Sequence, residues 1–150
     1  MPPLIVGLLI NGVAYALIAI ALAFVIERIG GPRYARLLVG VGLIVASLFY
    51  VYFAARENHS ALWNIGELVG VAVFGTLAVL GIRGSRWWLV VGWALHPFWD
   101  VVLHYFLPGR AFAPLGYVFA CLSFDLLVAA YVAWRRGWDV APMVEPEPRH

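Results

Sequence analysis

Two histidines and one aspartate lie at four-residue intervals within one long apolar stretch: His96, Asp100 and His104. An α-helix turns by ~100° per residue, so this spacing drifts only about 40° per step and forms one polar stripe about 12 Å long. Imidazole and carboxylate groups bind metal ions and transfer protons. Ionisable side chains inside a membrane-spanning segment are costly and by default indicate function. The stripe is therefore the first candidate for a functional site.

The composition indicates that membrane helices position this stripe. Of the 150 residues, 64% are hydrophobic and only 12% are charged, whereas roughly a quarter of the residues in a soluble protein are charged. All ten basic residues are arginines, and they are scattered near the ends of apolar runs. This pattern is typical of topology anchors and argues against a nucleic-acid-binding patch. The sequence therefore predicts a polytopic membrane protein with no nucleic-acid partner.

Five apolar runs of the sequence are long enough to cross a hydrocarbon core of ~30 Å, which needs about 20 residues. We expect an all-α fold, because an open sheet cannot satisfy its edges in lipid. The five transmembrane helices are predicted at about 3–26, 34–55, 61–82, 86–107 and 115–135. They form a single domain over residues 1–138. Short connections make successive helices antiparallel neighbours.

The two ends of the chain are expected on opposite sides of the membrane. Eight arginines lie in the segments that follow spans one, three and five, whereas only Arg56 and Arg110 lie on the other side. Short cytoplasmic segments carry the excess of basic residues. The N-terminus is therefore predicted outside, and the C-terminus in the cytoplasm. The segment 139–150, which contains prolines and acidic residues, is predicted to be a disordered cytoplasmic tail.

Polar residues of other spans fall at depths that match the stripe. At a rise of 1.5 Å per residue, Glu67 is predicted level with Asp100, and Asp125 level with His96, all between the midplane and the outer surface. Scattered structural polar residues would not share one leaflet so consistently. We therefore predict one cavity lined by spans three, four and five, with span one as a further wall. Four residues are predicted to support this site: Asn11, Asn64, Trp93 and Trp99.

A metal centre is the first chemistry that these residues predict. Imidazole and carboxylate groups bind Zn²⁺ and similar divalent ions, and a His/Asp pair four residues apart can bind one ion from one helix face. We expect His96, His104 and Asp125 as ligands, and Asp100 is an alternative ligand to His104. Metal-bound water, with its pKa lowered towards ~7, attacks an ester or amide. With Glu67 and Asp100 as catalytic acid–base groups, this predicts a metal-dependent hydrolase of an amphipathic or lipid substrate.

Two functions without a metal remain open. Acid–base groups of different proton affinity can isomerise or cyclise an isoprenoid lipid, and Trp93 and Trp99 can stabilise a carbocation, although packing is the commoner role of such side chains. Asp, Glu and His side chains also carry protons or cations across bilayers. A transporter of only five helices would need a homo-oligomer, or the chain would be a subunit of a larger complex. The apolar cytoplasmic half of span five argues against such a path.

The segment Gly92–His104 also resembles a known family. It matches the core Gly-Trp-x-x-His-x-x-Trp-Asp-x-x-x-His of small bacterial integral membrane proteins of unknown function. The likeness covers the second half of the chain and extends to residues 63–68 and to Cys121 with Asp125. The family often has paired histidines after Trp-Asp, whereas here Tyr105 follows. The resemblance implies that the histidines and carboxylates belong to one site in a bacterial inner membrane, and it implies no reaction.

Overall fold

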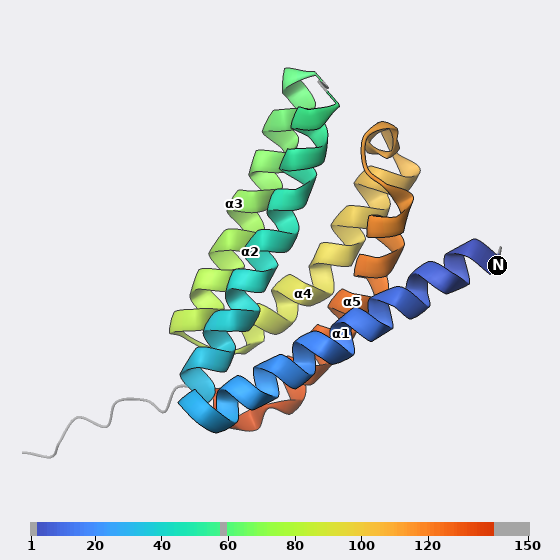
Figure 1. The fold of residues 1–150 in the computed structure, drawn as a ribbon. Coiled ribbons are helices and arrows are strands. Elements are labelled where there is room, and N and C mark those ends of the chain that lie inside the picture. The colour runs from blue at the N-terminus through green and yellow to red at the C-terminus, as the bar shows by residue number, and fades with distance from the viewer. Residues whose placement is uncertain (1–2, 58–59, 140–150) are drawn as a thin grey trace, which may run out of the picture.

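The computed structural model describes residues 3–57 and 60–139 (Figure 1). No strand occurs within these ranges, and five α-helices make up the bundle. They are α1 (Pro3–Gly30), α2 (Pro32–Arg56), α3 (Ala61–Arg83), α4 (Trp87–Val101) and α5 (Leu115–Trp134). A π-helix, η1 (Val102–Phe106), and two 3₁₀ turns, η2 (Pro108–Ala111) and η3 (Arg136–Trp138), complete the described chain. The prediction of an all-helical protein is confirmed.

Four helices, α1, α2, α3 and α5, are long and apolar enough to cross a membrane. The α4 helix has only 15 residues, but it runs directly into η1. Large apolar side chains are exposed around the bundle, for example Ile18 at 66% and Leu62 at 77%. An apolar surface of this extent is unusual in a soluble monomer. Such a surface is typical of helices that face lipid.

The first connection is shorter than the sequence indicated. The α1 helix does not end near residue 26 but continues to Gly30, so that Gly31 alone separates it from α2. Gly31 adopts a φ of 90°, which glycine reaches without strain. Pro32 then begins α2, where its fixed φ suits a first helical turn. Of the predicted tail, 139–150, only Asp139 lies within the described residues.

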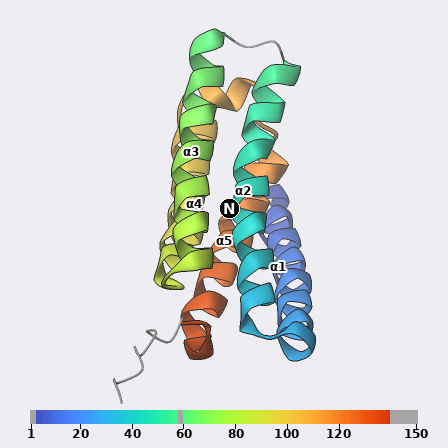
Figure 2. The same ribbon diagram turned by 90° about the vertical axis from the view of Figure 1, so that its left-hand side faces the viewer.

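Successive helices pack against one another, and α1 also packs closely on α5. Figure 1 shows α1 crossing the bundle obliquely in front of α5, and Figure 2 shows α2 and α3 side by side. The close approach of α1 depends on Gly12, because a Cβ there would overlap the carbonyl of Ala120 and the hydroxyl of Ser123. The Ser123 hydroxyl donates a 2.8 Å hydrogen bond to the carbonyl of Leu9. The contact fixes the position of α5, which carries Asp125.

Two apolar clusters form the core. One contains Leu43, Leu89, Trp93 and Val132, and the other contains Tyr50, Ala54, Phe112, Ala113 and Val118. His96 lies between them, with its ring 4.8 Å from the ring of Phe74 in the first cluster and 6.2 Å from that of Tyr50 in the second. The polar stripe therefore lies at the boundary of two apolar clusters.

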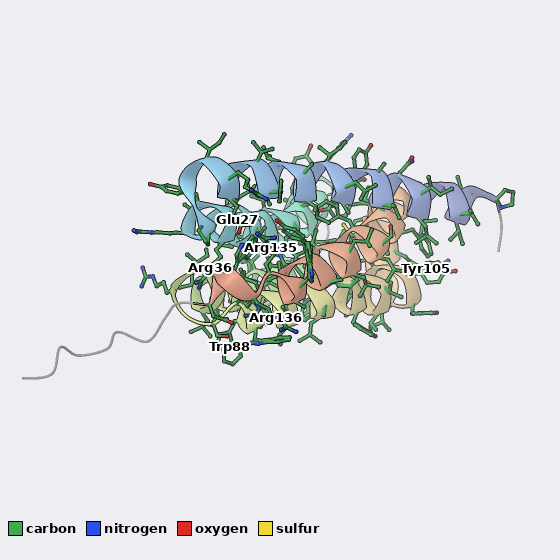
Figure 3. All side chains as sticks on the ribbon, turned by 90° about the horizontal axis from the view of Figure 1, so that it is seen from below. Glu27, Arg36, Trp88, Tyr105, Arg135 and Arg136 are labelled. Carbon is green, nitrogen blue, oxygen red and sulfur yellow. The ribbon has the colours of Figure 1, made fainter. Side chains whose placement is uncertain are left out.

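One end of the bundle is rich in arginine, opposite the end that carries Tyr105 (Figure 3). Arg36 is buried there, with 4% of its surface exposed. Its guanidinium donates to the carbonyls of Gly81, Gly84 and Trp138. The bonds to Gly81 and Gly84 satisfy carbonyls at the end of α3, and the bond to Trp138 ties η3 to the same place. Arg36 thus has a structural role that the sequence analysis did not predict.

Two ion pairs tie other elements together at the same end. Arg135, which follows α5, pairs with Glu27 on α1. Arg86, which precedes α4, pairs with Asp139 beyond η3. Both pairs are partly buried, so they hold the ends of the helices in place.

Candidate functional site

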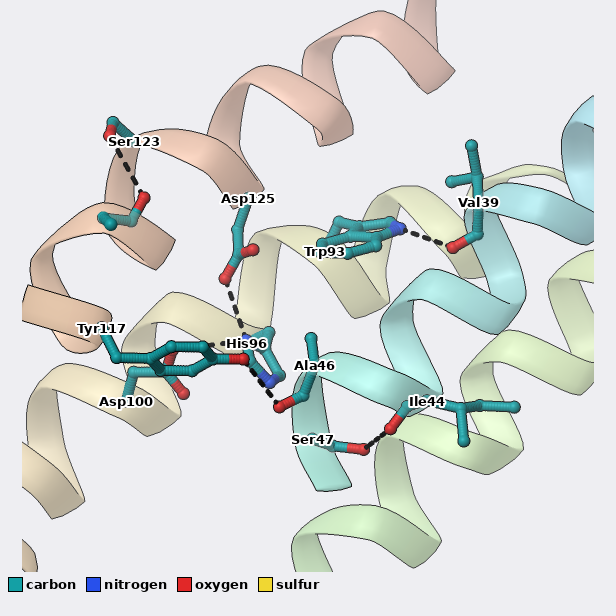
Figure 4. Close-up of polar contacts among 11 residues, drawn as sticks. Val39, Ile44, Ala46, Ser47, Trp93, His96, Asp100, Tyr117, Ser123 and Asp125 are labelled. Atoms are coloured by element: carbon teal, nitrogen blue, oxygen red, sulfur yellow. Dashed lines mark hydrogen bonds and ion pairs between the residues drawn. The ribbon is translucent and has the colours of Figure 1, made fainter. Parts of the chain in front are cut away.

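A compact polar group forms where α4 faces α5. His96 and Asp100 lie one turn apart on α4, and Asp125 faces them from α5 (Figure 4). The Nδ1 atom of His96 lies 2.9 Å from Oδ2 of Asp125 and 3.4 Å from Oδ2 of Asp100. All three side chains are completely buried, and one ligand atom from each lies within 4.8 Å of the others. This cluster, hereafter the three-residue group, can hold a metal ion.

Several atoms of the three-residue group lack a protein partner. Nε2 of His96, both oxygens of Asp100 and Oδ1 of Asp125 form no hydrogen bond of normal geometry with residues 3–57 or 60–139. Buried polar atoms are nearly always hydrogen-bonded. The ion pairs that these carboxylates form within the same ranges are with imidazole alone. A divalent cation would both occupy the free atoms and balance the buried charge.

A second buried pair lies nearby. His104 in η1 places Nε2 at 2.9 Å from Oε1 of Glu67 on α3. Nδ1 of His104 forms no hydrogen bond with the described residues. A carboxylate that holds one imidazole nitrogen orients the other for proton transfer. His104, predicted as a metal ligand, therefore lies outside the three-residue group, because Glu67 holds its Nε2. Asp100, which was given above as the alternative metal ligand to His104, lies in the group instead.

The π-helix η1 gives His104 its orientation. On a straight α-helix, His96 and His104 would drift apart by ~80° around the axis. The wider turn of η1, closed by the 3.1 Å bond from the amide of Leu107 to the carbonyl of Val102, has more residues per turn and reduces this drift. Such local widening is frequent at functional sites. The sequence analysis did not predict it, since the apolar pattern of the span gives no signal for it.

Tyr50 on α2 connects the two parts of the site. Its ring stacks on that of His104, with centroids 3.8 Å apart and planes at 11°. Its hydroxyl lies near the carboxylate of Asp100 but forms no hydrogen bond of normal geometry with the described residues. Tyr50 is 1% exposed. Span two looks generic in sequence, so this residue was missed, although a tyrosine three residues after Ser47 in an apolar run was a usable signal.

Two further residues border the three-residue group. Cys121 is buried one turn before Asp125, close to the carboxylate of Asp100. Tyr117 lies a turn earlier and donates a 3.2 Å hydrogen bond from its hydroxyl to the carbonyl of Ala46 (Figure 4). The site is thus enclosed by α2 as well as by α4 and α5.

The two asparagines predicted to support the site lie differently. Asn11 is exposed on α1, because the neighbouring Gly12 and the later Ala16 face the bundle. The expectation that it lines the site is not met. Asn64 is partly buried one turn before Glu67, and its Oδ1 has no hydrogen bond with the described residues. Asn64 thus lies on a neighbouring part of the α3 surface.

The two tryptophans beside the stripe serve packing. Trp93 is buried in the core, and its Nε1 donates a 3.2 Å hydrogen bond to the carbonyl of Val39. Trp99 lies against α3, where a Cβ on Gly70 would be 3.0 Å from its indole. The ring of Phe74 meets the ring of Trp99 edge-on at 6.0 Å. These contacts correspond to the commoner role stated above for such side chains.

The sequence predicted a cavity lined by spans three, four and five, with span one as a further wall, but the cavity beside this site is lined differently. A largely apolar cavity of about 640 Å³ lies mainly among α1, α2 and α5, with Trp93 of α4, Cys121 and Asp125 also in its wall. No residue of α3 lines it. Between α2, α3 and α4 the space is occupied by Tyr50, Phe74 and Trp99. The three-residue group is therefore approached from the α1 side, through Asp125.

The model of a family of unknown function, DUF6010, matches residues 8–139. The chain belongs to this family. The match extends through spans one and two, so it is wider than the resemblance seen in the second half of the sequence. Comparison with curated proteins finds no match, and neither does comparison with solved structures. The family carries no assigned activity, so a function has to be argued from the geometry of the site.

Proposed function

We propose that this DUF6010 protein binds one divalent ion, such as Zn²⁺, at His96, Asp100 and Asp125, and hydrolyses an amphipathic or lipid substrate. One observation carries the proposal. Three buried ligands lie within 4.8 Å of one another, and four of their nitrogen and oxygen atoms form no hydrogen bond of normal geometry with the described residues. Three protein ligands are typical of catalytic zinc sites, which keep a further position for water.

The chemistry follows from this arrangement. A divalent ion held by His96, Asp100 and Asp125 would supply Lewis-acid chemistry, since such ions lower the pKa of bound water towards ~7 and polarise carbonyl groups. The pair of Glu67 and His104 supplies an acid–base group, with Nδ1 of His104 free to exchange a proton. Tyr50 stacks on the His104 ring of this pair and lies close to Asp100 of the three-residue group, so it packs the two parts of the site together.

The proposal includes a topology with five spans. The continuous helical segment of α4 and η1 serves as the fourth span, and residues 1–138 form one membrane domain in the inner membrane of a bacterium. The arginines at the ends of α1, α3 and α5 and in the first turn of α2 gather at one end of the bundle. By the positive-inside rule this end is cytoplasmic, which places the N-terminus outside.

Proton or cation transport, by a homo-oligomer or a subunit of a larger complex, is the second candidate. The observation that favours it is a chain of polar contacts from Asp125 through His96 to Asp100, with the pair of His104 and Glu67 nearby. Towards the arginine end, however, the core next to these contacts is apolar. Metal-free isomerisation of an isoprenoid has less support, because both tryptophans beside the site are used for packing.

Metal content tests the proposal directly. Protein is purified in mild detergent without a chelator or a histidine tag, and its metals are measured by mass spectrometry, beside His96→Ala and the matched variant His104→Ala. We expect near-stoichiometric metal in the wild type and in His104→Ala, and loss of metal in His96→Ala. Metal-free wild-type protein, or equal metal in both variants, contradicts the proposal. Proton flux in vesicles that Asp125→Asn abolishes would then support the second candidate.

A further inference from the structure

The cavity among α1, α2 and α5 has the properties of a site for a hydrocarbon chain. Apart from Asp125, its wall consists of aliphatic and aromatic side chains, including three tyrosines, and of Cys121. Small residues on α2 and α5 leave room at its floor: Gly42, Ala46 and Ala120. Its volume of about 640 Å³ falls within the range of small-ligand pockets, roughly 300–1,000 Å³. Such a volume suits one chain rather than a whole two-chain phospholipid.

The location of the cavity favours entry from the bilayer. All three helices that form it are among those long and apolar enough to cross a membrane. Tyr15 and Phe49, which line the cavity from α1 and α2, are themselves exposed at 61% and 42%, so the cavity opens on the lipid-facing side of the bundle. A hydrocarbon chain can therefore enter without passing through water.

The inner end of the cavity is polar. Asp125 belongs to both the cavity wall and the three-residue group. Its side chain is completely buried, one oxygen contacts His96, and Oδ1 forms no hydrogen bond with the described residues. Among the described residues, Asp125 is thus the one acidic residue that lines the cavity, and it lies beside the atoms that can bind a metal. Because its side chain has no exposed surface, the polar end of a ligand reaches it only when neighbouring side chains move.

We infer that the cavity binds a single hydrocarbon chain, acyl or isoprenoid, which enters sideways from the bilayer and places its polar end at Asp125. The inference rests on the proposed function and names its substrate class: a single-chain lipid with a hydrolysable group at one end. The chain fills the space lined by Gly42, Ala46 and Ala120, and the polar end lies against the three-residue group.

Photolabelling tests the inference on the full chain in detergent. The probes are a diazirine-bearing palmitic acid, a diazirine-bearing farnesol and the alkane that corresponds to the first, and labelled peptides are mapped by mass spectrometry. Gly42→Phe fills the cavity, and a Cβ at Gly42 makes only ordinary contact with the Trp93 ring, at 3.4 Å. The matched control is Gly75→Phe on α3, where a Cβ would have no neighbour within 4 Å.

We expect labels on the cavity walls of α1, α2 and α5, lowered at least about tenfold by Gly42→Phe and unchanged by Gly75→Phe. The more strongly labelling of the two polar probes identifies the chain as acyl or isoprenoid. Equal labelling in both variants, or labels spread over outward-facing positions, overturns the inference. Labelling by the alkane equal to that by palmitic acid overturns the placement of the polar end. If Gly42→Phe does not elute as a folded protein, Ala46→Leu takes its place, with Ala72→Leu on exposed α3 surface as its control.

The labelling is read independently of metal content. Cavity labels on protein that binds no metal would leave the inference standing and remove the metal-dependent function. Stoichiometric metal without cavity labels would leave the metal-binding part of the proposed function standing and overturn the inference about the cavity.

Discussion

The arginine end and the centre of the bundle both bury charged groups, but they balance these charges differently. At the arginine end, Arg36 donates to three carbonyls, and Arg135 pairs with Glu27. At the centre, the carboxylates of Asp100 and Asp125 share one imidazole, and three of their four oxygens lack a normal hydrogen bond within the described residues. At the arginine end each buried cation has a carbonyl or carboxylate partner from the chain, although some of its nitrogens stay unbonded within the described residues, whereas at the centre two carboxylates share one imidazole.

A buried charge can therefore serve either to stabilise the fold or to bind something from outside the chain. A charge with its partners supplied by the chain stabilises one arrangement of the helices. A charge without them costs stability until something else binds. Substitutions in the two regions should therefore change stability in opposite directions.

The largest effect on stability is expected at Arg36. Arg36→Ala removes a charged donor from three buried carbonyls, and leaving these unsatisfied costs about 3 kcal/mol of the free energy of unfolding. Thermal unfolding in detergent measures it. The matched control is Arg33→Ala, an exposed position in the same helix turn, which should change stability by no more than about 0.5 kcal/mol. Equal melting temperatures of the two variants would show that the hydrogen bonds of Arg36 do not stabilise the arginine end.

The next largest effect is expected at Asp125. In the metal-free protein, the change in stability should be opposite in sign to that of Arg36→Ala. Asp125→Asn removes a buried charge, so the metal-free variant should be as stable as the wild type or more stable, by about 1 kcal/mol. Its affinity for Zn²⁺ should fall at least about 100-fold, because even groups that only orient a ligand contribute 10–100-fold. Melting curves with and without Zn²⁺ measure both quantities. A variant less stable than the wild type without metal would make Asp125 a structural residue.

A smaller effect on binding is expected at Glu67. Glu67→Gln keeps a hydrogen-bonding group beside His104 but removes the negative charge that orients and activates the imidazole. Metal content should stay unchanged, while hydrolysis of the substrate identified by labelling should fall by about 100-fold. Loss of metal in this variant would show that the two halves of the centre form one ligand set.

The smallest effect is expected at Asn11. This side chain is exposed on α1, away from the site. Asn11→Ala should change metal content, labelling and melting temperature very little, within about 0.5 kcal/mol for stability. A clear loss of labelling would move the cavity entrance to this face of α1.

The helices and the pairing of polar residues were predictable because they depend on local properties. Apolar length determines which segments span a membrane, and helical rise determines depth, so Asp125 could be placed beside His96 before any contact was known. Glu67 was predicted level with Asp100, whereas the structure pairs it with His104, one turn farther along the same span. Burial cost explains why these ionisable residues stand out in an apolar sequence.

The features that the sequence did not predict depend on contacts between segments that are distant in the chain. Tyr50 belongs to the site because α2 packs on α3 and α4, which no spacing within span two indicates. The cavity lies beside α1 because Gly12 brings that helix onto α5, and because aromatic side chains fill the space where the cavity was expected. Arg36 resembles any other topology anchor in sequence, and only the position of the end of α3 gives it its buried role.

Because η1 is a π-helix, the number of residues in this segment determines where His104 lies in the site. The wider turn of η1 accommodates one residue more than an α-helix would between the same two ends. Deleting Leu103 would let the segment return to α geometry, and the helix would still reach η2. His104 would then lie one residue nearer to His96, so its direction and its height along the axis would no longer match Glu67 and the ring of Tyr50. A change in residue count, with every residue type of the site retained, would thus separate the acid–base pair from the three-residue group.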